Sequence, residues 1–368
     1  MKTKKLPLSN SSKFSLFLLI FLVVFYLRFA STFYLEILEI FNNTSSKDSP
    51  PFSSPTSLQP PPLSPSPPFL PNSSLIDNDD IELFSRSLNV KATNFSIPKV
   101  AFLFLTNDNL PLAPLWEKFF KGHESFYSIY VHSHPLYKDA SPKHSVFHGR
   151  RIPSKPVTWG STSMIDAEKR LLANALLDFS NQRFVLLSDT CIPLYNFTTV
   201  YNYLINSKLS FLQLKDDPRE DGRGRYNKKM LPSVSIVDWR TGSQWFELHR
   251  ELAIVVVSDQ TYYPIFREFC RDPCFQDEHY IPTLVNLVAP ELNSNRSVTW
   301  VDWSKNTGAH PQRFVGSDIT LEFMENIRVG SDCTYNEEAS SICWLFARKF
   351  APDTLELLMK IASVLMEY

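Results

Sequence analysis

A long apolar run near the N-terminus constrains this chain more than any other feature. It begins at Phe14, is interrupted by Arg28 and resumes through Leu35, and no acidic residue precedes Glu36. A bilayer span takes roughly 20 apolar residues, so residues 14–35 are long enough if Arg28 extends its guanidinium to the headgroups. Four lysines lie before the run, and such a flank stays in the cytosol. We therefore expect a cytosolic tail over 1–13 and a transmembrane signal anchor over 14–35, with the rest of the chain in the lumen.

A cleaved signal peptide is the alternative for this segment. Residues 14–27 alone would fit the apolar core of a signal peptide. Cleavage after Ala30 would place Arg28 where a small residue is required, which favours the uncleaved anchor.

A proline- and serine-rich stretch follows, with ten prolines between Pro50 and Pro71. Such a composition cannot bury enough apolar area to offset the entropy of ordering, so we expect a disordered luminal stem over 36–96. Sequons for N-glycosylation, which agree with a luminal location, occur at Asn42, Asn43, Asn72, Asn94, Asn196 and Asn295. A proline-rich ligand of a cytosolic SH3-type domain is the alternative, and the predicted orientation disfavours it.

The charge and the cysteines exclude two classes of function. The formal net charge of -1 argues against a nucleic-acid-binding protein, which normally has a basic face. The Cys270–Cys274 pair has no second pair at zinc-ligand spacing, so no zinc site is expected. Cys333 and Cys343 could form a short-loop disulfide, with buried free thiols as the alternative, and the odd total of five leaves one cysteine over.

From residue 97 to 368 the pattern predicts one α/β domain. Apolar runs over 99–106, 126–132 and 183–189 suit buried parallel strands, and 111–121, 163–179 and 197–206 suit helices. The alternation, continued by 210–214, predicts a doubly wound parallel sheet, in which ligands bind at the carboxyl ends of the strands. Thr106, His132 and Asp189 lie at those ends. The glycine-rich loops typical of dinucleotide and P-loop sites do not occur.

Five motifs occur in order along this domain. They are Trp159-Gly-Ser-x-Ser-Met-x-x-Ala-Glu168, Leu187-Ser-Asp-x-Cys-Ile-Pro193, Gly242-Ser-Gln-Trp-Phe246, Asp277-Glu-His-Tyr280 and Leu345-Phe-Ala-Arg-Lys-Phe350. Together they resemble the plant branch of the core-2/I-branching β-1,6-N-acetylglucosaminyltransferase family over residues 97–366. The resemblance implies a GT-A-like Rossmann-type domain that transfers a sugar from a UDP-sugar to a glycan or glycoprotein acceptor, with inversion and without a metal.

The same resemblance leaves the donor open, because the family also contains peptide xylosyltransferases and plant glucuronosyltransferases. N-acetylglucosamine and glucuronic acid are the first candidates. The order of tail, anchor, stem and domain is typical of type II Golgi transferases, so we expect a Golgi membrane protein, and a homodimer is compatible with the sequence. A luminal glycan-binding protein that has lost turnover is the rival interpretation.

Transfer from a UDP-sugar needs a base for the acceptor hydroxyl and charge compensation for the departing diphosphate. Many transferases of this fold hold a divalent metal with an Asp-x-Asp motif, whereas Ser188-Asp189-Thr190 supplies one carboxylate. We therefore expect no metal cofactor, with cationic side chains in its place. The resemblance assigns this role to Arg328 and Lys349, and the alternative for Arg328 is a helix cap.

Glu278 matches the catalytic base of the family. If a helix begins near Asp277, Glu278 lies in the first turn, where the helix dipole favours a negative charge. Pro282 complicates this interpretation, because its ring would clash with the Glu278 carbonyl inside a helix. Whether the helix begins before Glu278 or at Pro282 stays open.

The remaining candidates are weaker. Trp159 and His132 are expected to border the nucleotide, and Trp245 and Glu247 to contact the acceptor. Arg225 and Lys228 belong to a basic cluster that could hold an acidic acceptor, with a solvated loop as the alternative. A role in the core is the alternative for both tryptophans.

Overall fold

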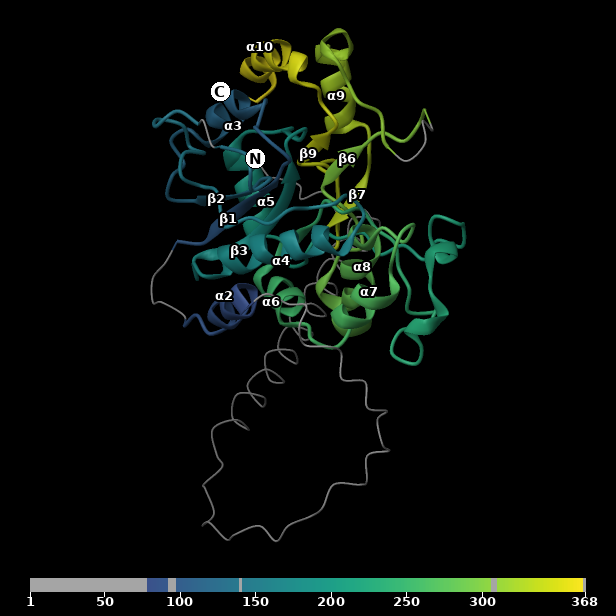
Figure 1. Ribbon diagram of the computed structural model, residues 1–368. Helices are drawn as coiled ribbons and strands as arrows, with labels where there is room; N and C mark the ends of the chain where they lie inside the picture. Colours follow the sequence, from purple (N-terminus) through teal and green to yellow (C-terminus); the bar gives the residue numbers. More distant parts are fainter. Residues whose placement is uncertain (1–77, 92–96, 139–140, 306–309, 367–368) are drawn as a thin grey trace, which may run out of the picture. The chain divides into compact units, whose positions relative to one another are not determined.

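The computed structural model describes residues 78–91, 97–138, 141–305 and 310–366 (Figure 1). The predicted tail, the predicted anchor and the stem up to residue 77 lie outside the described residues, so they stay predictions. Within the described ranges, no helix has both the length and the apolar character needed to cross a membrane.

The main sheet has the order β2-β1-β3-β5. The strands β1 (Lys99–Leu105), β2 (Tyr127–His132) and β3 (Asn181–Ser188) run parallel, as the apolar runs predict. The edge strand β5 (Glu247–His249) is antiparallel to β3, so the expectation of a purely parallel sheet is wrong at this edge. Residues 210–214 form isolated bridges, such as that between Phe211 and Glu247, in place of a strand.

Helices cover both faces of this sheet, which is why the central strand β1 is apolar from Val100 to Leu105. Val100, Phe102 and Phe104 of β1 share one core with α3 (Ala113–Phe120) and α5 (Phe197–Ile205). The alternate residues of β1 face the second core, which includes α4 (Thr162–Leu176), α6 (Arg250–Ser258) and α8 (Gln276–Val288). Figure 1 shows the sheet between these two layers. The two cores hold these parallel strands in place, so the carboxyl ends of β1, β2 and β3 lie at one edge of the sheet.

Smaller elements complete the described chain. A second sheet has the order β4 (Ile192–Pro193), β9 (Phe346–Arg348) and β6 (Thr299–Val301), and β7 (Cys333–Tyr335) pairs with β8 (Glu338–Ser340). The remaining helices are α7 (Tyr263–Phe269), α9 (Leu321–Val329) and α10 (Leu355–Leu365). Short 3-10 turns are η1 (Arg223–Arg225), η2 (Lys228–Met230), η3 (Pro290–Leu292), η4 (Gly316–Asp318) and η5 (Pro352–Thr354).

The predicted stem contains a helix, α2 (Asn78–Leu88), that packs against α4 and α6. Its Leu83 and Phe84 join the second core. Asp80 accepts hydrogen bonds from Arg170 at 2.8 Å and from Lys155 at 2.9 Å. Burial opposes ionisation of Asp80, but these cations hold its pKa below the ordinary value. The expected stem boundary at residue 96 is therefore too late, because the apolar and acidic residues of α2 bind the domain.

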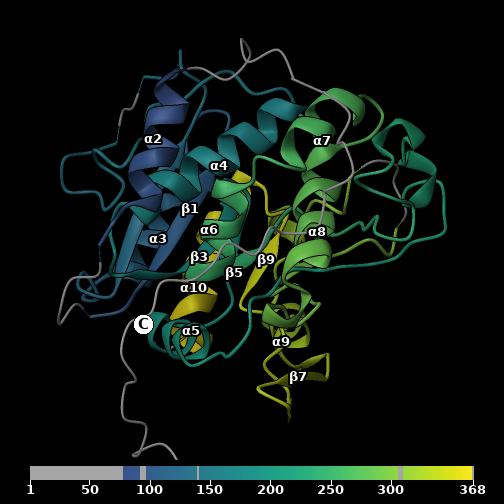
Figure 2. The same ribbon diagram turned by 90° about the horizontal axis from the view of Figure 1, so that it is seen from below.

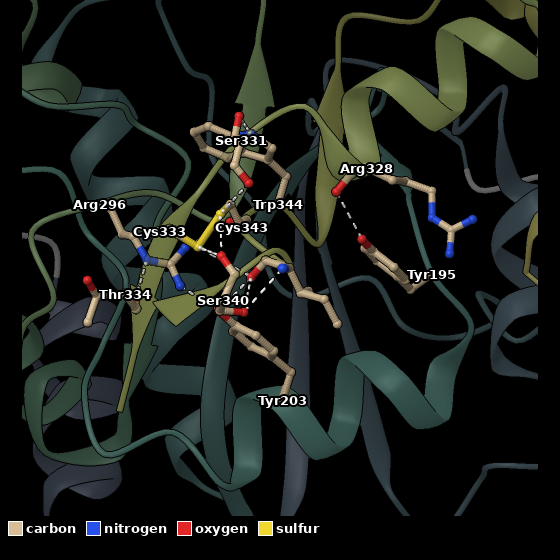
Figure 3. The surroundings of a disulfide bond; sticks show 11 residues. Tyr195, Tyr203, Arg296, Arg328, Ser331, Cys333, Thr334, Ser340, Cys343 and Trp344 are labelled. Atoms are coloured by element: carbon tan, nitrogen blue, oxygen red, sulfur yellow. Dashed lines mark hydrogen bonds between the residues drawn. A yellow bond between two sulfur atoms is a disulfide. The ribbon is translucent and has the colours of Figure 1, made fainter. Parts of the chain in front are cut away.

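Two disulfides lie in the C-terminal half, Cys270–Cys274 and Cys333–Cys343. Figure 3 shows the second one, which closes the β7–β8 hairpin. Of the two alternatives left open for Cys333 and Cys343, the structure has the disulfide, and it adds the Cys270–Cys274 bond, for which no pairing was expected. Cys191 is the free thiol that the odd count requires, and it is buried.

Candidate functional site

The carboxyl ends of β1, β2 and β3 meet at one edge of the sheet, where the parallel pattern places Thr106, His132 and Asp189. The Thr106 amide donates to the His132 carbonyl at 2.9 Å, which joins the ends of β1 and β2. Thr106 is nearly buried, and its hydroxyl donates to the Asp108 carbonyl at 2.9 Å. Asp189 is half-buried just beyond the end of β3. All three residues lie at the predicted edge, but their exposure differs.

The His132 ring lies beneath this edge and is not open to a ligand. The side chain is buried, and Nε2 accepts the backbone N–H of Lys155 at 3.3 Å. Burial, together with the charges of Arg170 and Arg151, lowers the pKa of His132 to about 4. His132 is therefore neutral and supports the 152–155 segment, which corrects its expected contact with the nucleotide.

Glu278 lies in the first turn of α8, which begins at Gln276 and contains Pro282 within it. Pro282 has no N–H to donate to the Glu278 carbonyl. The Gly242 amide donates to that carbonyl at 2.9 Å instead. A Cβ on Gly242 would lie 2.0 Å from the Gln213 carbonyl oxygen, so only glycine fits there. The open question is thereby settled: the helix begins before Glu278, whose carboxylate lies where the helix dipole stabilises a negative charge.

The start of α8 is hydrogen-bonded to the segment that precedes α4. Figure 2 shows the two helices. The Gln276 backbone amide donates to the Gly160 carbonyl at 3.2 Å, and the Gln276 side chain donates to the Thr162 hydroxyl at 2.7 Å. Gly160 has φ +74, and a Cβ there would lie 2.6 Å from the Phe275 ring. These contacts explain why two motifs far apart in the sequence, at 159–168 and 277–280, belong to one site.

A series of ring contacts extends from Glu278 across the site. Arg225 of η1 forms an ion pair with Glu278, with 2.6 Å between Nη1 and Oε2, and its guanidinium lies 4.4 Å from the centre of the Phe275 ring. Phe275 contacts Trp159 at 4.8 Å between centroids, and Trp159 contacts His310 at 4.9 Å. Trp159 is 48% exposed, so the alternative that it belongs to the core is wrong. This half-exposed aromatic surface is suited to stacking on a planar or sugar ring.

Cationic side chains gather beyond Trp159, around Asp189. Burial and the charge of Arg348 lower the pKa of Lys349, Asp189 opposes that change, and Arg313 adds to it. Burial raises the pKa of Asp189, while Arg348 and Lys349 oppose the increase. His310 also feels Lys349 and Arg348, which together with burial lower its pKa. Arg348 and Lys349 lie beside Asp189, and Arg313 acts on Lys349. The group has a net positive charge, which suits an anionic ligand.

Arg328 contacts α10 and Tyr195, and its pairing with Lys349, expected from the resemblance, stays a prediction. It ends α9, donates to the Leu365 carbonyl at 3.1 Å and lies 4.4 Å over the Tyr195 ring. Figure 3 shows Arg328 beside Tyr195, whose hydroxyl donates to the Arg328 carbonyl. The alternative of a capping role is closer to what is observed, although the capped carbonyl belongs to α10.

Arg313 lies beside Lys349 because the segments that contain them pair like parallel strands, although they are distant in sequence. Phe314 forms a parallel bridge with Phe350, and the Phe314 amide donates to the Lys349 carbonyl at 2.8 Å. This register brings residue 313 next to residue 349. No local motif marks Arg313, so sequence reasoning missed it, as it missed His310 and Phe275.

Two residues expected to contact the acceptor are buried. Trp245 is 7% exposed within the second core, and the guanidinium of Arg348 lies 4.1 Å from its ring, so the alternative of a core role is right. Glu247 is completely buried on β5, where both carboxylate oxygens lie 3.4 Å from Nη1 of Arg183. Burial raises the pKa of Glu247 to about 7, and Arg183 opposes the increase. Neither side chain is open to an acceptor.

Lys228 is exposed on η2, and its predicted role stays a prediction. Among the described residues, no group of three or more His, Cys, Asp or Glu side chains is arranged to hold a metal ion. A surface cavity of about 820 Å³ lies elsewhere, between α3 and α10, and contains none of the predicted site residues. The site therefore combines a half-exposed carboxylate, an aromatic surface and a group of cations.

Comparisons with known proteins identify the family. Residues 100–328 match the family described as Core-2/I-Branching enzyme. A protein from Oryza sativa subsp. japonica named Glycosyltransferase BC10 is 37% identical over 298 residues, which cover 68% of this chain and 73% of the relative. The family match spans more than half of the chain and includes Glu278 and the Trp159 motif. The chain therefore belongs to the core-2/I-branching enzyme family and is a glycosyltransferase.

Proposed function

We propose that this protein is an inverting, metal-independent transferase that moves a sugar from a UDP-sugar to a glycan or glycoprotein acceptor, with Glu278 as the general base. The observation that carries the proposal is the series Glu278–Arg225–Phe275–Trp159–His310, which joins a half-exposed carboxylate to the cations around Lys349. A base at one end and cations at the other match the two ends of the displacement.

Each group has a defined part in this proposed reaction. Glu278 takes the proton of the acceptor hydroxyl as that oxygen bonds to the anomeric carbon. The bond from that carbon to the diphosphate breaks on the opposite face, and UDP leaves. Lys349 and Arg313 compensate the charge that develops on the leaving diphosphate. Because Arg225 bonds to Oε2 of Glu278, Oε1 is the oxygen that receives the proton.

Independence from a metal is supported by the residues at the end of β3. Ser188-Asp189-Thr190 supplies a single carboxylate, and that carboxylate already faces Arg348 and Lys349. A divalent cation there would compete with two positive side chains.

A location in the Golgi membrane with a luminal domain is part of the proposal. The two disulfides support it, because such bonds form in the oxidising secretory compartments. The predicted anchor over 14–35 would hold the enzyme in the membrane.

UDP release by the full-length chain, purified in detergent, tests the proposal. UDP-N-acetylglucosamine and UDP-glucuronic acid are measured first and UDP-xylose next, each with a panel of glycan acceptors. Glu278→Ala should lower turnover by about 10²–10⁴-fold, because it removes the general base. The control Glu291→Ala, at an exposed glutamate of η3, should have no effect.

Equal turnover by the wild type and the Glu278→Ala variant would exclude Glu278 as the base. Glycan binding without turnover of any donor would favour the binding-protein interpretation. Undiminished turnover in EDTA is expected, and its loss would contradict independence from a metal.

A further inference from the structure

The carboxylate of Glu278 is held by one side chain. Nη1 of Arg225 donates to its Oε2 at 2.6 Å, and no second hydrogen bond reaches this carboxylate from the part of the chain that the structure describes. The Glu278 side chain is 34% exposed, so without this bond it would sample several rotamers. A base acts only when its oxygen lies within hydrogen-bond reach of the proton it removes. The bond from Arg225 therefore bears directly on the proposed reaction.

Arg225 is itself held in place. Its guanidinium lies 4.4 Å from the centre of the Phe275 ring, and its side chain is only 16% exposed. Phe275 directly precedes α8, so the same helix entry supplies both the ring and Glu278. Nη2 also donates to Oδ1 of Asp221 at 3.2 Å, an exposed contact that adds little. The ring and the two carboxylates leave the guanidinium few other positions.

The loop over residues 217–225 has internal contacts that specify its conformation. The Gly222 carbonyl accepts the Arg225 amide at 3.1 Å and Nε1 of Trp239 at 3.1 Å. A Cβ on Gly222 would lie 2.3 Å from the Asp217 carbonyl oxygen, so only glycine fits there. The Asp217 carboxylate is buried and accepts from Nε of Arg219 at 2.9 Å. The 217–225 loop is therefore a built support for the residue at its end, Arg225.

Trp239 connects the 217–225 loop to α8. Its ring is 1% exposed and stacks on the ring of His279, with 4.5 Å between centroids. His279 directly follows Glu278, and burial lowers its pKa to about 4, so the ring is neutral. Nδ1 of His279 donates to the Arg240 carbonyl at 2.9 Å. Contacts before and after Glu278 thus fix α8 relative to the loop that carries Arg225.

We propose that Arg225 is the positioning residue of the base: it holds Oε2 of Glu278 so that Oε1 is directed to the acceptor hydroxyl, and the 217–225 loop fixes Arg225 for this role. The inference rests on the proposed role of Glu278. In this role Arg225 acts through Glu278 and not on the substrate. The sequence-based expectation, in which Arg225 holds an acidic acceptor, instead requires direct contact with the acceptor, so the two roles affect different kinetic constants.

Arg225→Ala in the full-length chain separates these two roles. It should lower kcat by roughly 10–100-fold because the base is misplaced, while KM for donor and acceptor should change less than about twofold. Arg223→Ala is the matched control on the same turn, because Arg223 is exposed and pairs with Asp216. It should change neither constant. A higher KM for the acceptor at unchanged kcat would assign Arg225 to the acceptor and overturn the proposal.

A double-mutant cycle with Glu278→Ala tests whether Arg225 acts through Glu278. With alanine at position 278, Arg225→Ala should lower kcat further by less than about twofold. A loss of about tenfold or more in that background would overturn the proposal. Wild-type turnover by Glu278→Ala alone would refute the base and, with it, this inference. If Glu278→Ala loses turnover and Arg225→Ala does not, the base stands and the positioning role is refuted.

Trp239→Phe tests the support given by the loop without changing Arg225. It keeps an aromatic ring beside His279 and removes the Nε1 bond to the Gly222 carbonyl. We expect kcat to fall by about 2–10-fold at unchanged KM values, the size of one neutral hydrogen bond. Thermal unfolding shows whether the variant is folded at the assay temperature. Wild-type kcat in folded Trp239→Phe would contradict the part assigned to the 217–225 loop.

Discussion

Two arginine–glutamate pairs in this protein have the same chemistry and opposite surroundings. Arg225 and Glu278 lie 2.6 Å apart, with side chains 16% and 34% exposed. Arg183 and Glu247 lie 3.4 Å apart, with side chains 1% and 0% exposed. The first pair joins two surface segments beside the aromatic residues of the site, and the second joins β3 to β5 inside the domain.

The difference shows that burial decides whether a carboxylate is open to a ligand or contacts only its partner. A half-exposed glutamate such as Glu278 is open to solvent and to a ligand. A completely buried glutamate serves only its partner, and removing either member leaves the other unsatisfied. Motif position alone made both residues candidates for substrate contact.

The largest effect expected for these two pairs is a loss in the free energy of unfolding when Glu247 is replaced. Glu247→Leu leaves the Arg183 guanidinium buried with only backbone carbonyls as partners, so the free energy of unfolding should fall by about 3–5 kcal/mol. The matched change Glu278→Leu should cost about 1 kcal/mol or less, because that pair is partly exposed. Urea denaturation of both variants gives the two values. Equal losses would contradict the distinction.

A smaller effect is expected from Arg313 and Arg328, the two arginines considered for the proposed diphosphate position. Arg313→Ala should lower kcat/KM for the UDP-sugar by roughly 10–100-fold, which corresponds to a charge-assisted hydrogen bond of about 1.5–3 kcal/mol. Arg328→Ala should leave kcat/KM unchanged and lower the melting temperature, because it removes contacts with Leu365 and Tyr195. Steady-state kinetics on both variants shows which of the two arginines contributes to kcat/KM for the UDP-sugar. A larger kinetic loss at Arg328 would restore the pairing expected from the resemblance.

Asp80 provides an intermediate case, a carboxylate with 11% side-chain exposure and two cationic partners. Asp80→Asn should lower the free energy of unfolding by about 1–3 kcal/mol, since Arg170 loses its charged partner. The control Glu82→Gln on the same helix should cost less than about 1 kcal/mol, because its contact with Arg86 is exposed. Thermal unfolding measures both, and a neutral Asp80→Asn would imply that α2 contributes little to the domain.

The buried pair should also make stability depend on pH. Glu247 has a pKa of about 7 in the folded protein against an ordinary value of 4.5, so the folded state holds the proton more tightly. Its contribution to stability is therefore complete below pH 4.5 and is lost as the pH rises through 7. The stability of the wild type minus that of Glu247→Gln should fall across this window by roughly 1 kcal/mol per pH unit. A flat difference would show that Glu247 is ionised throughout.

Much of the fold was predictable because it depends on local patterns. The apolar runs that became β1, β2 and β3 had to be buried on both faces, and the amphipathic segment of α4 required a helix. The carboxyl ends of these strands marked one edge of the sheet in advance. The motifs likewise assign Glu278, Trp159, Asp189 and Lys349 to one site. Ring contacts link Glu278 to Trp159, and Lys349 lies beside Asp189, while the roles of these residues stay predictions.

The sequence alone therefore determined which functional side chains are present and the edge of the sheet at which we expect them. Only the tertiary structure decided which side chains reach that edge. Arg313 reaches Lys349 through the Phe314–Phe350 bridge, and Gly242 supplies the hydrogen bond that lets Glu278 precede Pro282 in α8. Glu247 is buried in the interior because β5 pairs with β3. The physical reason is the same in each case: local periodicity fixes how a segment folds, whereas exposure and partners depend on segments distant in sequence.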